Sequence, residues 1–135
     1  MAKSTAACLD TSVLLRLLVG EPERQAKIAK EALDELCNAG GKVFVSDLVL
    51  SETYFALQFH YKVPKKEAIA VLRNLSQSKE VECSTIARSV LTQSNLHSAN
   101  PGFIDRLIHA QYETTGAPML TFEKAPKKLP NTRVL

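Results

Sequence analysis

Four acidic residues, Asp10, Glu52, Asp105 and Glu123, occupy positions from which carboxylates are expected to face one another. Asp10 ends a short apolar run and directly precedes a helical pattern, and Glu123 follows another apolar run. In open α/β folds, the carboxyl ends of parallel strands line the crevice in which ligands bind. Asp10 is therefore the first candidate for chemistry, and the other three acids are candidates to join it.

Glu52 and Asp105 belong to segments with helical spacing. Glu52 lies in line with an apolar stripe that we expect its helix to bury, formed by Leu48, Phe55 and Phe59. Asp105 falls in the first turn of a later helix, where an acid also favours the helix dipole. An ionised carboxylate in an apolar setting is costly, so it protonates or acquires a cation.

A cluster of these four acids would have a definite chemistry. Carboxylates that lie close together raise one another's pKa and destabilise the fold unless a cation joins them. Hard oxygen ligands without His or Cys favour Mg²⁺ or Mn²⁺ over zinc. One or two such ions generate hydroxide from water, hold a scissile phosphate and stabilise the leaving oxygen. The sequence thus predicts a metal site suited to cleaving phosphodiester bonds.

The elements that must position these acids alternate between strand and helix. This order predicts an α/β fold with a short, mostly parallel central sheet and helices on both faces. The expected strands are 6–9, 43–45, 81–83, 118–122 and 132–135. The expected helices are 13–19, 21–39, 48–61, 65–76, a fifth from 84 or 85 to about 96, and 103–115.

Length and composition indicate a single globular domain over residues 1–135. Hydrophobic residues make up 45% and charged residues 23%, which excludes a disordered or fibrous class. Cys8, Cys37 and Cys83 lack CxxC spacing and are expected to be reduced thiols. The first residues lead straight into a strand without a leader peptide, and no apolar run approaches the ~20 residues that cross a bilayer. We therefore expect a soluble cytoplasmic protein without a membrane partner.

Four short motifs resemble, in order and spacing, those of PIN-domain ribonucleases, and most closely those of VapC-type toxins of toxin–antitoxin pairs. The motifs are LDTSVLL (9–15), SE (51–52), FIDRLIHA (103–110) and LTFE (120–123). The resemblance spans nearly the whole chain. It implies a metal-dependent endoribonuclease, usually a homodimer, restrained by a small antitoxin whose tail blocks the acidic cleft.

The resemblance also assigns roles to individual residues. Asp10, Glu52 and Asp105 match the acids that bind the metal and activate water. Ser12 and Thr121 match small polar positions beside them, which orient ligands or water. Helix capping and strand filling explain these two residues equally well.

The chain departs from the family pattern at two positions. Most relatives have aspartate where this chain has Glu123, and they commonly have another acid soon after it, whereas lysines follow here. Glu123 either reaches the metal, directly or through water, or pairs with a lysine and leaves three ligands. Many relatives also have an acid at the position of Gly102.

Basic residues near the later motifs are candidates for holding RNA. The net charge of +3 is by itself a weak pointer to polyanions. The basic run after Glu123 is better placed, so we expect phosphate contacts from Lys124, Lys127, Lys128 and Arg106. The alternative to the enzyme is a PIN-like fold with a degraded metal site, acting as an RNA-binding or protein-interaction module.

Overall fold

The computed structural model describes residues 6–135. The expected leaderless start at residues 1–5 lies outside the described residues. The chain divides into two compact units, one extending to Ser84 and the other from Thr85 to Leu135. Each unit has its own parallel sheet and helices, and each is described by itself below.

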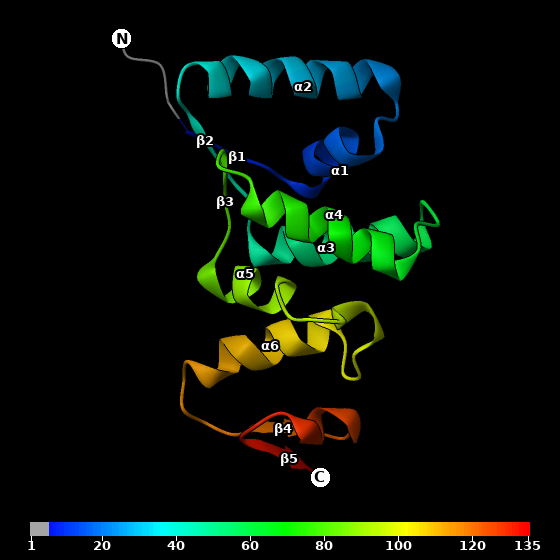
Figure 1. Ribbon diagram of the computed structural model, residues 1–135, viewed down its shortest axis with the longest axis vertical. Coiled ribbons are helices and arrows are strands. Elements are labelled where there is room, and N and C mark those ends of the chain that lie inside the picture. Colours follow the sequence, from blue (N-terminus) through cyan, green and yellow to red (C-terminus); the bar gives the residue numbers. More distant parts are fainter. Residues whose placement is uncertain (1–5) are drawn as a thin grey trace. The chain divides into compact units, whose positions relative to one another are not determined.

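Strands and helices alternate in both units (Figure 1). The first unit contains β1 (Ala6–Cys8), α1 (Thr11–Val19), α2 (Glu23–Asn38), β2 (Lys42–Phe44), α3 (Asp47–Phe59), α4 (Lys65–Gln77) and β3 (Val81–Glu82). The second contains α5 (Thr85–Leu91), the 3₁₀ turn η1 (Leu96–Ser98), α6 (Phe103–Glu113), β4 (Met119–Thr121), the 3₁₀ turn η2 (Ala125–Lys128) and β5 (Thr132–Val134). The predicted α/β class is confirmed.

The sheet of the first unit has the order β1-β2-β3, and both pairs are parallel, as predicted. Its register aligns Cys8 with Phe44 and Phe44 with Glu82, so the three strands end at one edge. Val43 is buried on one face of β2, whereas Phe44 on the other face is 45% exposed. The first candidate acid, Asp10, therefore follows the end of an edge strand.

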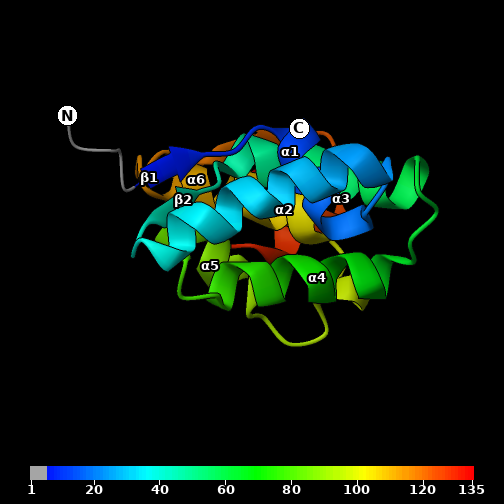
Figure 2. The same ribbon diagram turned by 90° about the horizontal axis from the view of Figure 1, so that it is seen from above.

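Helix α1 begins and ends where the sequence places its capping residues. Asp10 is its N-cap, and Gly20 is its C-cap with a φ of 80°, in the left-handed region that glycine favours. Helix α1 packs against α2 and α3, and α3 packs against α4. Figure 2 shows α2 running alongside the strands β1 and β2.

The second unit is built around α5, α6 and a two-stranded sheet. Helices α5 and α6 pack together, and β4 pairs with β5 in parallel, with Met119 opposite Thr132. Phe103, at the start of α6, is 1% exposed. This anchored first turn carries Asp105.

The buried face of α3 is not the one that the sequence analysis selected. Leu48 and Phe59, expected to be buried, are 77% and 69% exposed, and Phe55 is also exposed. The buried residues lie on the opposite side of the helix and are Leu50, Thr53, Tyr54 and Leu57. Because α3 is apolar on both sides, helical periodicity alone does not choose between them. Glu52 is in line with the exposed stripe.

The fifth helix is shorter than expected. It ends at Leu91 rather than near Leu96, and the chain then passes through Asn95, whose φ of 55° is left-handed. A non-glycine residue in that conformation cannot continue a right-handed helix. Leu96 instead begins the turn η1 and is buried.

Two expectations from composition can be compared with the described residues. Cys8, Cys37 and Cys83 form no disulfide in the described residues. Within residues 6–135, no helix has the length and apolar character that a membrane span requires.

Candidate functional site

The carboxylate of Asp10 is fixed by hydrogen bonds at the start of α1. Its Oδ1 accepts from the backbone N–H of Val13 at 3.1 Å and from the hydroxyl of Ser12 at 2.7 Å. Asp10 is exposed, and it has the extended backbone typical of an N-cap. One carboxylate oxygen thus caps the helix, while Oδ2 has no hydrogen bond of its own among these contacts.

The same hydrogen bonds determine the charge state of Asp10. The Ser12 hydroxyl, followed by the Val13 N–H, lowers the pKa of Asp10 below its usual 3.8. Repulsion between neighbouring acids would act in the opposite direction. The donors supplied by the first turn of α1 account for the lowered pKa. Asp10 is therefore ionised at neutral pH, as a metal ligand must be.

Glu52 is brought to the head of α1 by a residue that the sequence analysis did not single out. The hydroxyl of Thr11 donates to Oε1 of Glu52 at 2.9 Å, across 41 positions of sequence. Thr11 directly follows Asp10 in the sequence. This hydrogen bond therefore holds the carboxylate of Glu52 beside the residue that follows Asp10. The sequence does show a hydroxyl at Thr11 in the first motif. Which acid that hydroxyl contacts, however, depends on how α1 packs against α3.

Asp105 has a different environment in the second unit. It lies in the first turn of α6, three residues after the N-cap Gly102, and it is exposed. Among residues 6–135, no hydrogen bond or ion pair involves its carboxylate. A Cβ built at Gly102 would meet only the carbonyl oxygen of Ala99, at 3.8 Å, which is ordinary van der Waals contact.

Glu123 follows β4, as predicted, and its backbone is held by Thr121. The N–H of Glu123 donates to the hydroxyl of Thr121 at 3.0 Å. In the part of the chain that the structure describes, Glu123 forms no ion pair with Lys124 or with any other lysine. The carboxylate is exposed, so the alternative in which it is neutralised by a lysine gains no support.

The basic residues assigned to RNA divide into two kinds. Lys124 and Lys127 are exposed and form no side-chain hydrogen bond within the described part of the chain. Arg106 donates from Nε to the carbonyl oxygen of Pro101 at 2.7 Å, and Lys128 donates from Nζ to that of Asn100 at 3.2 Å. Lys124 and Lys127 are thus the better candidates for phosphate contacts.

The donor set fits a hard divalent cation in kind. No lysine or arginine forms an ion pair with any of the four acids in residues 6–135, and Asp10 is held in its charged form. Within either unit taken alone, the described residues contain no group of three or more His, Cys, Asp or Glu side chains that could hold a metal. The first unit contains Asp10 and Glu52, of which Glu52 accepts from Thr11, and the second unit contains Asp105 and Glu123.

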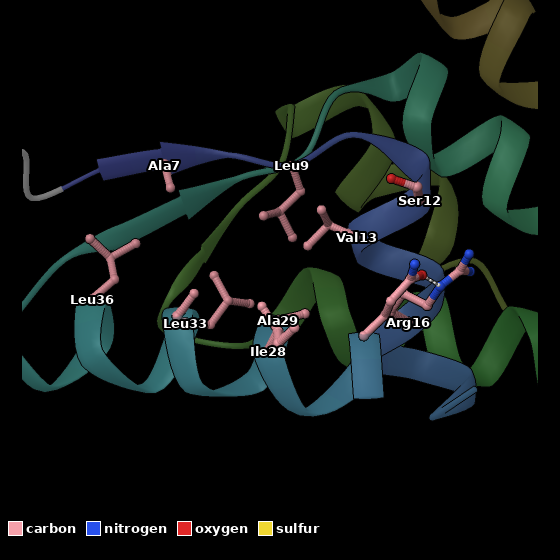
Figure 3. Close-up of a pocket in the computed structure, with 11 residues that line it drawn as sticks. Ala7, Leu9, Ser12, Val13, Arg16, Ile28, Ala29, Leu33 and Leu36 are labelled. Carbon is pink, nitrogen blue, oxygen red and sulfur yellow. Dashed lines mark hydrogen bonds between the residues drawn. The ribbon is translucent and has the colours of Figure 1, made fainter. Parts of the chain in front are cut away.

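A cavity of about 590 Å³ lies beside Asp10 in the first unit. Figure 3 shows Leu9 and Val13 on one side of it, facing Ile28, Leu33 and Leu36 of α2. Arg16 closes one end, where its Nε donates to Gln25 at 2.6 Å. The apolar residues Ile28, Leu33 and Leu36 of α2 thus line a cavity, and none of the residues of α2 is buried.

The PIN domain family matches residues 7–131 of the chain. Because this match covers most of the chain and includes all four motifs, the protein belongs to the PIN domain family. It is 30% identical over 125 residues to the VapC ribonuclease of Aquifex aeolicus (strain VF5), covering 90% of each chain. The resemblance drawn from the four motifs is confirmed at the level of the family.

Proposed function

We propose that this protein is a metal-dependent endoribonuclease and the toxin of a toxin–antitoxin pair, with residues 1–135 acting as one catalytic domain. The observation that carries the proposal is the ionised Asp10, tied through Thr11 to Glu52 in a PIN domain chain. The name of the VapC ribonuclease that it resembles supports RNA as the substrate.

In the proposed mechanism, Asp10, Glu52, Asp105 and Glu123 are the residues that would hold Mg²⁺ or Mn²⁺ through their carboxylate oxygens. When bound, such an ion supplies an activated water and charge stabilisation at the scissile phosphate. The Ser12 hydroxyl orients the carboxylate of Asp10, and the Thr11 hydroxyl orients that of Glu52. Thr121 orders the backbone at Glu123, and Lys124 and Lys127 attract the phosphates of single-stranded RNA.

The test is cleavage of a fluorescent single-stranded RNA by the purified protein, freed of any bound partner. We expect cleavage with Mg²⁺ or Mn²⁺, none with EDTA, and a loss of roughly 10²–10³-fold in Asp10→Asn. The matched control is Glu31→Gln, which removes one exposed acid from α2. Full activity in EDTA, or in Asp10→Asn, would refute the metal-dependent mechanism.

The alternative is a PIN-like fold that binds RNA or protein without cutting. Its one specific support is Glu123 in place of the family's aspartate, followed by Lys124. RNA binding without cleavage in either metal would establish this alternative.

The proposed partners are a small antitoxin and a second copy of the chain, in the cytoplasm. The apolar cavity between α1 and α2 supports a protein partner, and three cysteines without a disulfide in the described residues suit a reducing compartment. Sedimentation of the isolated protein tests the homodimer. The antitoxin is tested by adding to the cleavage assay any small protein that proves to be encoded beside this one. An unchanged rate would reject that protein as the inhibitor.

A further inference from the structure

Two of the four cations assigned to RNA are directed at the protein's own backbone. Arg106 donates to the carbonyl oxygen of Pro101, and Lys128 donates to that of the preceding residue, Asn100. The guanidinium also donates from Nη1 to Oε1 of Gln93 at 3.3 Å. Side chains from α6 and η2 therefore converge on two consecutive carbonyl groups.

Those carbonyls lie just before the helix that carries Asp105. Gly102 is the N-cap of α6 and makes no side-chain capping hydrogen bond, so the helix lacks the usual device that fixes its first turn. Pro101 and Phe103, on either side of Gly102, are buried. The position of the first turn, and hence of Asp105, depends on the segment that the two cations hold.

We infer that Arg106 and Lys128 are positioning residues for Asp105, and that Lys124 and Lys127 alone of the basic set hold RNA. Arg106 neighbours Asp105 in sequence, yet it forms no ion pair with it in the described residues. A charged donor on a carbonyl oxygen is a strong hydrogen bond, and that of Arg106 is partly buried. Removing it frees the turn without changing any group at the proposed metal site.

The inference rests on the proposed function for its catalytic consequence, but its structural part can be measured separately. Hydrogen exchange of the amides in residues 99–106 is compared in wild type, Arg106→Ala, Lys128→Ala and the control Lys127→Ala. We expect exchange about tenfold faster in the first two variants and unchanged in the control. Unchanged exchange in both Arg106→Ala and Lys128→Ala would overturn the inference, whether or not the protein cuts RNA.

Kinetics distinguish positioning from phosphate binding. Arg106→Ala should lower kcat about tenfold and require more Mn²⁺ for half-maximal rate, with KM for RNA unchanged. Lys127→Ala should raise KM for RNA and leave kcat unchanged. Arg106→Lys retains one donor and should recover part of kcat. A rise in KM alone for Arg106→Ala would assign Arg106 to RNA and overturn the inference.

Discussion

The two units present their acids in different ways. In the first, the carboxylates themselves accept hydrogen bonds, from Ser12 and Val13 to Asp10 and from Thr11 to Glu52. In the second, the backbone beside each acid is held instead, through Pro101 before Asp105 and through Thr121 before Glu123. A donor to the carboxylate orients the charged group itself, whereas a hydrogen bond to the backbone positions only the main chain from which the acid extends. Substitutions of the hydrogen-bond donors in the two units should therefore have different effects on the acids.

The largest effect beyond that of Asp10→Asn is expected at Glu123. If Glu123 is a fourth ligand, Glu123→Gln should lower RNA cleavage by about 10–100-fold, and Glu123→Asp should retain most of the rate. Rates are measured at saturating RNA across a Mn²⁺ titration. Wild-type rates in Glu123→Gln at every concentration would instead show that three acids suffice.

A smaller loss is expected when the tie between the first two acids is removed. Thr11→Val keeps the shape of the side chain but removes the donor to Glu52, so we expect about tenfold slower cleavage. Thr11→Ser, which keeps the hydroxyl, is the matched control. Equal rates for the Val and Ser variants would mean that Glu52 needs no such donor.

The smallest effect is on stability and concerns pH. The folded-state pKa of Asp10 is lowered, so its contribution is present above its usual 3.8 and is lost as pH falls through the folded value. Ser12→Ala removes the main cause and should raise that pKa. Urea unfolding should show a destabilisation at about pH 7 that becomes smaller as the pH is lowered toward about 2.

The background variant for this pH prediction is Asp10→Asn. In that background, Ser12→Ala should have the same effect on the free energy of unfolding at both pH values, because the titrating group is gone. A pH-dependent difference that persists in the double variant would assign the effect to another group.

The sequence predicts best those features that depend on residues close together in the chain. The position of Asp10 between a strand and a helix could be predicted from the residues next to it. The parallel pairing in both sheets could be predicted from the alternation of strands and helices. The buried face of α3 was predicted wrongly because both sides of the helix are apolar. Leu50 and Leu57 on one side are as hydrophobic as Leu48 and Phe59 on the other.

The candidate site was harder to predict where contacts are distant. The tie from Thr11 to Glu52 joins residues 41 apart, and the bond from Lys128 to Asn100 joins residues 28 apart. Neither hydrogen bond produces a periodic pattern of residues from which it could be predicted. Arg106 and Lys128 were predicted to bind RNA from their charge alone. The sequence shows that these side chains are cationic, but it does not show that they donate to the carbonyl oxygens of Pro101 and Asn100.

Helix α2 has a consequence for the integrity of the molecule. None of its residues is fully buried, and its apolar side borders a cavity as well as packing against α1. Detaching α2 would expose less apolar surface than unfolding the whole unit, so local opening there costs less than global unfolding. Proteases should therefore cut first within this helix, at sites such as Lys27 and Lys30, while the rest of the chain stays folded.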